Sequence, residues 1–138
     1  MNIDSIKTGF VIDHITAGKS MEIYMLLGLE ELDCSVAIIR NASSKKLGKK
    51  DIIKIDGDFE PNLDILGYVD PNVTVNIIKD GVRVEKFHPE LPKSLHNVIK
   101  CKNPRCITTT EQGIEHIFRL TDEKNHVYRC IYCDSSSR

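Results

Sequence analysis

Four cysteines in the last third of the chain are the residues best suited to chemistry. Four residues separate Cys101 from Cys106, two separate Cys130 from Cys133, and 23 residues lie between the pairs. Two close cysteine pairs can supply four thiolates that converge tetrahedrally on Zn²⁺. Because four protein ligands leave no position for water, the spacing predicts one structural zinc ion per chain.

Free buried thiols and a redox pair at Cys130 and Cys133 are the alternatives to zinc. A redox pair normally opens a helix in a thioredoxin-like unit, and the sequence DSSSR after Cys133 predicts no helix. The remaining cysteine, Cys34, is expected to pack as a small apolar side chain in a strand. Few aromatic residues and little net charge favour a protein partner over nucleic acid for the zinc module.

A second group of candidate residues is basic. Lysines crowd the segment 45–54, at positions Lys45, Lys46, Lys49, Lys50 and Lys54. They form either a solvated loop or a polyphosphate site, in which ammonium groups neutralise phosphate charge. Strand alternation over residues 50–56 places Lys50, Ile52 and Lys54 on one face, so the two lysines can act together.

Residues 13–20, DHITAGKS, resemble a phosphate-binding P-loop. The first glycine of that motif is missing, and the chain is too short for the parallel sheet that usually accompanies it. Entry into a helix is therefore the favoured interpretation. No adjacent nucleophile and base occur in the sequence, so a catalytic role is not expected.

Composition excludes several classes of protein. The 138 residues carry a net charge of −1 and are 41% hydrophobic, which argues for a globular chain and against a general nucleic-acid binder. No segment approaches the roughly 20 apolar residues of a membrane span, and the first residues lack the apolar run of a signal peptide. A cytoplasmic protein without membrane or nucleic-acid partners is expected, and a reducing compartment makes disulfides unlikely.

The first part of the chain is predicted to be α+β. Strands are expected at 6–15, 34–41, 50–56, 73–79 and 82–88, a helix at 19–29, a second helix from Pro61 through Val69, and a basic, flexible loop at 42–49. This order contains the β-α-β-β-α-β unit of ferredoxin-like folds, an antiparallel sheet with two helices on one face. The apolar face of the first helix is predicted to comprise Met21, Tyr24, Met25, Gly28 and Leu29.

A stiff connector, HPELP at 88–92, separates this part from the cysteine module. Strands at 115–120 and 126–131 are expected to form a hairpin, giving a small all-β zinc-ribbon-like domain. The predicted domains are residues 1–92 and 93–138.

Several short motifs, taken in order, resemble the regulatory chain of aspartate carbamoyltransferase. They are GFVIDHI at 9–15, GKKDIIKI at 48–55, TVN at 74–76, Leu91-Pro92 and the cysteine module. The resemblance covers nearly the whole chain. It implies a non-catalytic regulatory subunit whose first domain binds nucleoside triphosphates and pairs with a second copy. The zinc domain would dock on the catalytic chain.

The resemblance also implies roles for individual residues. Asp13 and Lys54 would approach the ribose, and His14 and Lys86 the phosphates, with Lys50 as a further phosphate partner. The base pocket would comprise Ile3, Asp4, Ser5, Ile6 and Val11, facing Asn76 and Ile78. Asn103, Glu111 and Tyr132 would lie near the catalytic chain. Gly81 and Arg105 depart from the residues common in the family.

The function implied is allosteric control of pyrimidine biosynthesis by CTP, UTP and ATP, without catalysis by this chain. A nucleotide-binding, zinc-ribbon adaptor of another enzyme is one alternative. A zinc-ribbon protein that binds nucleic acid is another. Co-purification with a catalytic chain would distinguish the implied regulatory subunit from the first alternative. A salt-dependent interaction with DNA or RNA would support the second alternative.

Overall fold

The chain divides into two compact units. The computed structural model describes residues 7–137, and the division falls between Glu90 and Leu91. This is two residues before the predicted domain boundary, because the buried Tyr128 hydroxyl donates a hydrogen bond to the Pro92 carbonyl at 2.5 Å and so ties Pro92 to the second unit. None of the helices described is long and apolar enough to cross a membrane.

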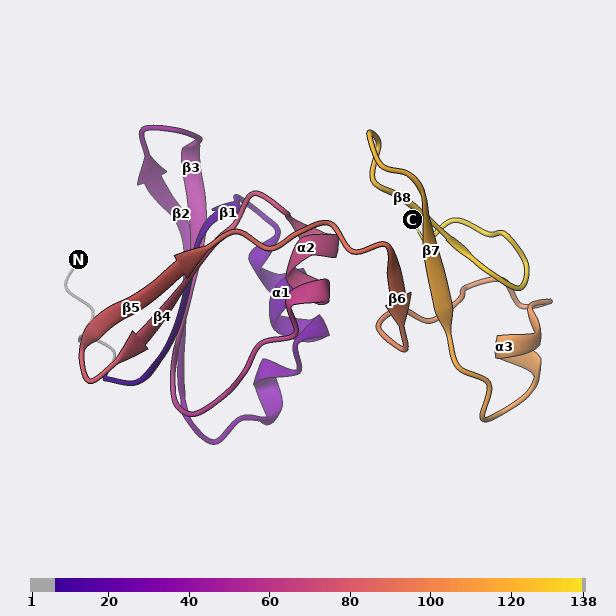
Figure 1. Ribbon diagram of the computed structural model, residues 1–138, viewed down its shortest axis with the longest axis horizontal. Coiled ribbons are helices and arrows are strands. Elements are labelled where there is room, and N and C mark those ends of the chain that lie inside the picture. The colour runs from indigo at the N-terminus through magenta and orange to yellow at the C-terminus, as the bar shows by residue number, and fades with distance from the viewer. Residues whose placement is uncertain (1–6, 138) are drawn as a thin grey trace. The chain divides into compact units, whose positions relative to one another are not determined.

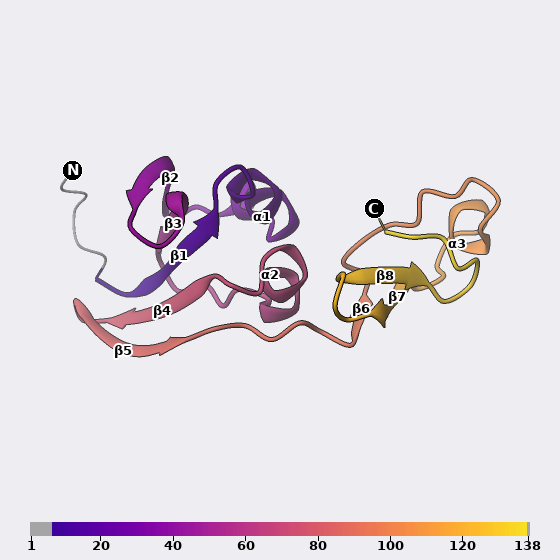
Figure 2. The same cartoon turned by 90° about the horizontal axis from the view of Figure 1, so that it is seen from above.

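The first unit is a five-stranded antiparallel sheet with two helices. The strands are β1 (Gly9–Thr16), β2 (Ser35–Ser44), β3 (Gly48–Asp56), β4 (Thr74–Lys79) and β5 (Val82–Phe87), in the order β2-β3-β1-β4-β5. Helices α1 (Ser20–Leu26) and α2 (Leu63–Val69) lie on the same side of this sheet in both ribbon views (Figures 1 and 2). The predicted ferredoxin-like α+β arrangement is confirmed.

Alternation along the strands builds the core between sheet and helices. Ile53 and Ile55 on β3 are fully buried, as are Ile12 on β1 and Val75 on β4, whereas Lys54, Val11 and Asn76 beside them are only half-buried. Helix α1 contributes Ile23, and α2 contributes the whole buried run Ile65–Val69. One sheet face is therefore covered by helices, and the opposite face carries the partly exposed residues of the same strands.

The predicted apolar face of the first helix is wrong except at Leu29, which is buried. Met21 and Met25 are 43% and 63% exposed, whereas Ser20 and Ile23, which were not predicted, are buried. The helix also ends at Leu26, and a short 3₁₀ turn, η1 (Leu29–Glu31), follows Gly28, whose φ is +67°. The left-handed glycine ends the helical path before Leu29, so the periodicity predicted over 19–29 does not extend that far.

Two other predicted boundaries differ from the structure. The segment 42–49 is not a flexible loop, because the ladder pairs Ala42 with Lys50 and Ser44 with Gly48, leaving residues 45–47 as the turn. Helix α2 begins at Leu63 rather than Pro61, because the Asn62 side chain accepts a hydrogen bond from the Asp64 amide at 3.0 Å and caps the helix.

Two carboxylates fasten the segment that resembles a P-loop. Asp70 accepts hydrogen bonds from the Thr16 amide at 2.9 Å and hydroxyl at 2.7 Å. Asp51 accepts from the Gly18 amide at 3.1 Å and the Ser20 hydroxyl at 2.6 Å. Donors that a P-loop would offer to phosphate are thus bound to side chains of the same unit, which supports the interpretation of this segment as entry into a helix.

Asp51 is a buried acidic residue whose ionised form stabilises the first unit. Burial alone would raise its pKa, but hydrogen bonds from Ser20 and from the Asn41 and Gly18 amides outweigh burial and hold the pKa below its ordinary value. Because the folded-state pKa is depressed, the ionised Asp51 contributes its full stabilisation of the fold above the unfolded pKa near 3.9. It is lost as pH falls through the folded value.

We expect Asp51→Asn to destabilise the first unit by about 1.5–3 kcal/mol at pH 7, since the charged acceptor of three groups is lost. The wild-type advantage should shrink as pH falls below about 4. Urea unfolding followed by NMR signals of the first unit, between pH 7 and pH 3, measures both effects. Asp58→Asn, at an exposed position, is the control. An equal loss of stability in both variants would contradict the assignment.

The second unit is a three-stranded antiparallel sheet with one short helix. Strands β6 (Ser94–His96), β7 (Ile117–Asp122) and β8 (Val127–Cys130) pair in that order, and α3 (Ile107–Thr110) is a single turn. Leu95, Phe118 and Tyr128 form a small buried cluster. The predicted β7–β8 hairpin is confirmed, whereas β6 and α3 were not predicted.

Candidate functional site

The four cysteines of the second unit converge in the structure. Their Sγ atoms all lie within 4.8 Å of one another, with Cys101 and Cys133 3.5 Å apart and Cys106 and Cys130 3.7 Å apart. Tetrahedral Zn–S bonds of about 2.3 Å would separate sulfurs by about 3.8 Å, so these positions fit one zinc ion. None of the four is in a disulfide.

Local hydrogen bonds shape the two cysteine turns. In the first turn, the Asn103 side chain accepts from the Arg105 amide at 3.0 Å, and the Asn103 carbonyl accepts from the Cys106 amide at 3.1 Å. His116 accepts from the Cys101 amide at 3.3 Å. In the second turn, the Asp134 amide bonds the Cys130 carbonyl at 2.8 Å. These contacts hold the ligands in position without occupying a coordination site.

The four thiols differ in pKa, and a metal cation bound to all four would stabilise each of them as a thiolate. Burial raises the pKa of the Cys101 thiol to about 12 and also raises the pKa of Cys130. The Thr108 hydroxyl lowers the pKa of Cys106, and the Ser135 hydroxyl lowers that of Cys133 to about 6. Four thiolates together therefore need a neutralising cation, which Zn²⁺ supplies. The cluster is a structural zinc site with its four positions filled by protein.

A β-bulge in β1 shapes the open face of the first sheet. Ile12 pairs with Ile53 and Ile15 pairs with Asp51, so two residues of β1 stand opposite a single residue of β3. Ile12 and Ile15 are both fully buried although they are three positions apart. The extra residue, together with the left-handed φ of +57° at His14, brings both Asp13 and His14 to the face opposite the helices.

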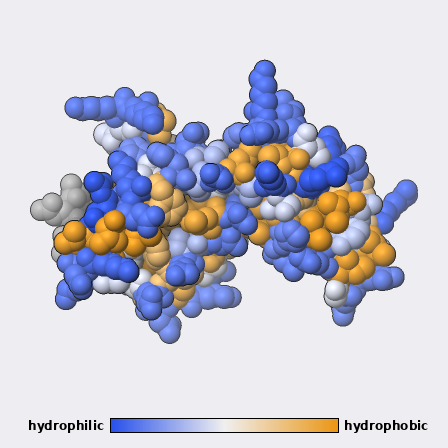
Figure 3. All heavy atoms as spheres, in the orientation of Figure 1, coloured by the Kyte–Doolittle hydropathy of each residue, from blue (hydrophilic) through white to orange (hydrophobic). Residues whose placement is uncertain are grey.

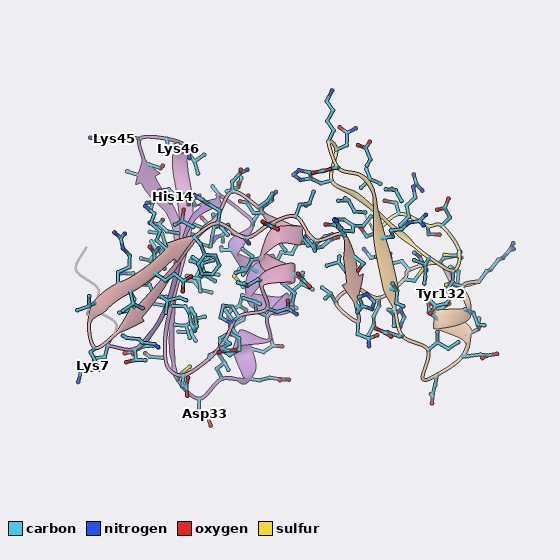
Figure 4. All side chains as sticks on the ribbon, in the orientation of Figure 1. Lys7, His14, Asp33, Lys45, Lys46 and Tyr132 are labelled. Carbon is cyan, nitrogen blue, oxygen red and sulfur yellow. The ribbon has the colours of Figure 1, made fainter. Side chains whose placement is uncertain are left out.

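Polar contacts on this face hold the two residues at the bulge, Asp13 and His14, in place. The Asp13 carboxylate forms an ion pair with Lys50 at 2.9 Å, with side-chain exposures of 24% and 17%. The His14 Nδ1 atom lies 3.1 Å from the Thr74 hydroxyl. In Figure 4, His14 lies near the base of the β2–β3 hairpin, and Lys45 and Lys46 lie at its tip. The lysines of the β2–β3 hairpin and the two residues at the bulge thus lie at the same end of the sheet.

Strand register places a second set of polar residues in one row across the same face. Lys54 pairs with Val11, Val11 with Asn76, and Asn76 with Lys86, so four adjacent strands contribute. The Asn76 amide group also donates to the Val11 carbonyl at 3.3 Å. Three strand spacings separate the Lys54 and Lys86 backbones by about 14 Å, with Val11 and Asn76 between them.

The predicted nucleotide-site residues that are described all lie on this open face: Val11, Asp13, His14, Lys50, Lys54, Asn76, Ile78 and Lys86. The predicted contribution of Ile3, Asp4, Ser5 and Ile6 lies outside the described residues. The expectation that Lys50, Ile52 and Lys54 share a face is confirmed, because Asp51, Ile53 and Ile55, which alternate with them, are buried on the other face.

The predicted partner-interface residues are partly accessible. Tyr132 is 44% exposed, Glu111 is exposed, and Asn103 is half-buried because it closes the first cysteine turn. Two further apolar residues beside the metal ligands, Ile107 and Ile131, are 44% and 48% exposed and were not singled out from the sequence. Their position directly beside Cys106 and Cys130 was the available signal, since residues next to metal ligands at a turn face outward. Apolar atoms gather over this part of the second unit (Figure 3).

Comparisons with known proteins agree with both units. Residues 1–90 match the family described as aspartate carbamoyltransferase regulatory chain, allosteric domain, and residues 93–138 match its metal binding domain. The regulatory chain of Clostridium botulinum is 54% identical over 134 residues, 97% of this chain and 92% of that protein. The regulatory chain of Clostridium acetobutylicum is 49% identical with the same coverage. That of Bifidobacterium longum is 43% identical over 138 residues, 100% of this chain and 99% of that protein.

The zinc module and the two family matches define a non-catalytic regulatory subunit of a larger enzyme. The chain belongs to the family of aspartate carbamoyltransferase regulatory chains, and a catalytic chain of that enzyme is its partner.

Proposed function

We propose that the open face of the first unit binds nucleoside triphosphates, namely CTP, UTP and ATP. Binding there would control aspartate carbamoyltransferase and hence pyrimidine biosynthesis. The observation that carries this proposal is the placement of His14, Lys50, Lys54 and Lys86, from three strands, on one sheet face. Three ammonium groups and an imidazole can neutralise a polyphosphate, and Asn76 between them offers both donor and acceptor groups.

The ion pair between Asp13 and Lys50 supports preorganisation of this site. Both side chains are less than one-quarter exposed, so they are held in place before a ligand arrives. Asp13 and Lys54 are assigned to the ribose, His14 and Lys86 to the phosphates, and Lys50 to an additional phosphate contact. Val11 and Ile78, half-buried on the same face, give apolar surface for a base.

Control of the catalytic chain requires that a nucleotide bind two quaternary states of the enzyme with different affinity. Coupling free energies of about 1–3 kcal/mol are typical of such systems.

Pairing with a second regulatory chain belongs to the proposal, and the edge strands β2 and β5 are where a sheet can extend into another copy. Reduced, metal-spaced thiols support a cytoplasmic setting.

Calorimetric titration of the zinc-loaded chain with CTP, UTP and ATP tests the proposal. Saturable binding that weakens as salt concentration rises is expected, because ammonium–phosphate contacts are screened by ions. Sedimentation of the same sample measures self-association. If none of the three nucleotides binds at millimolar concentration to a folded chain, the proposed site is wrong.

The docking surface is proposed to comprise α3 and the Cys130–Cys133 turn, where Ile107, Ile131 and Tyr132 are exposed. Zinc fixes both segments, so docking should depend on the metal. The surface combines aliphatic and aromatic groups, which is typical of the centre of a protein interface.

We expect Ile131→Asp to weaken binding to the catalytic trimer by about 10- to 100-fold, because a carboxylate would be desolvated at the interface. Zinc content should not change, since Ile131 is not a ligand. The matched control is Lys124→Asp in the β7–β8 turn, at the other end of the hairpin. Surface plasmon resonance with immobilised trimer measures both. Equal affinities of wild type and Ile131→Asp for the trimer would show that the docking surface does not include this turn.

A further inference from the structure

A second β-bulge redirects an arginine onto the proposed nucleotide face. Along β4 and β5, Ile77 pairs with Glu85 but Ile78 pairs with Arg83, so β5 contains one extra residue, Val84. In a regular strand, residues 83 and 86 would face opposite sides of the sheet. Because of the extra residue, Arg83 lies on the same sheet face as Lys86.

Arg83 continues the site toward the apolar end of the face. Register places Gly9, Ile78 and Arg83 in one row, next to the row of Val11, Asn76 and Lys86. Successive rows on one face are about 7 Å apart along the strands. The row of Arg83 is thus two rows away from Asp13 and its partner Thr74, at the end where Ile78 provides apolar surface.

Nothing in the described part of the chain engages the Arg83 side chain. The residue is exposed, and it forms no hydrogen bond or ion pair with any described residue. Gly81 at the adjoining turn has a φ of +77° and no atom within 4 Å of the position that a Cβ would occupy. Within residues 7–137, no atom closes the side of the row at the turn, and a ligand placed over Ile78 can reach the guanidinium.

We propose that Arg83 determines base specificity, favouring bases that present a ring carbonyl (uracil, cytosine or guanine) over adenine. The inference rests on the proposed nucleotide site. A guanidinium has five N–H donors and no acceptor, so it needs acceptors from its ligand. Lysines and His14 at the other rows supply the phosphate contacts. A ring carbonyl has two lone pairs that accept from a guanidinium, whereas adenine has no carbonyl and offers only single ring nitrogens as acceptors beside its donating amine.

Calorimetry of Arg83→Ala with UTP, CTP, ATP and inorganic triphosphate tests this assignment. Affinity for UTP and CTP should fall about tenfold, the scale of one well-placed pair, whereas ATP and inorganic triphosphate should change by less than about twofold. Arg83→Lys keeps the charge but lacks the planar fork, so it should lose most of the same selectivity. Arg119→Ala, at an exposed position in the second unit, should change nothing.

The outcomes separate the two proposals. Absence of nucleotide binding by the wild-type chain would overturn the nucleotide site itself. Binding by wild type with an unchanged UTP:ATP ratio in Arg83→Ala would overturn only the base-reading role. An equal loss for all nucleotides and for inorganic triphosphate would instead assign Arg83 to the phosphates, and it too would overturn the inference.

Discussion

Cys130→Ser is expected to unfold the second unit and to abolish docking on the catalytic chain. Leu95, Phe118 and Tyr128 form too small a cluster to hold roughly 45 residues by burial alone. Zinc supplies on the order of 10 kcal/mol to modules of this size, and a three-thiolate site loses much of that free energy. The first unit should remain folded, because its core between sheet and helices contains no zinc ligand.

Zinc content by elemental analysis and two-dimensional NMR of the variant measure this result. About one equivalent is expected in wild type and much less in Cys130→Ser. Cys34→Ser is the matched control, since Cys34 lies outside the cluster and packs beside Gly57. A variant that keeps the NMR signals of a folded second unit without metal would contradict the structural role of zinc.

Lys54→Ala and Lys86→Ala are each expected to weaken triphosphate binding without unfolding the protein. A charge-assisted contact contributes about 1.5–3 kcal/mol, which corresponds to a roughly 10- to 150-fold change in affinity. Both side chains lie on the open face, so truncation creates no cavity in the core. Calorimetric titration with CTP and ATP measures the loss, and the slope of affinity against salt concentration should decrease.

Lys45→Ala is the control for this pair. Lys45 has the same charge but lies at the tip of the β2–β3 hairpin (Figure 4), where exposed charges contribute little. A change of less than about twofold is expected there. If Lys54→Ala and Lys86→Ala bound nucleotides as tightly as wild type, the assignment of the open face would be wrong even though the chain is folded.

Alternation and turn chemistry made most of the first unit predictable. Ile53 and Ile55 alternate with Lys54 and so define the buried face of β3, and the turn pair Asp80-Gly81 between two strand-like segments predicts the β4–β5 hairpin that the structure contains. The cysteine spacing likewise predicts the metal cluster, because few arrangements of two close pairs satisfy a tetrahedral ion. These signals are local, so no knowledge of tertiary contacts was required.

The two bulges could not be read from the sequence, although both shape the proposed site. His14 adopts a left-handed φ without being glycine, and Val84 is an ordinary strand former. Their extra positions become visible only when the partner strand is known, since register is a property of the pair. The buried face of α1 was misassigned for a similar reason. Ser20 is buried because Asp51 binds it, a contact between residues 31 positions apart.

The most direct test of regulation combines this chain with a catalytic trimer of aspartate carbamoyltransferase. Aspartate saturation is measured with and without CTP, UTP and ATP, for wild type and for the double variant Lys54→Ala/Lys86→Ala. We predict that nucleotides shift the half-saturating aspartate concentration with wild type but not with the double variant, while both assemble equally. Equal nucleotide shifts with both chains, or no shift in an assembled wild-type complex, would contradict the proposed control through the open face.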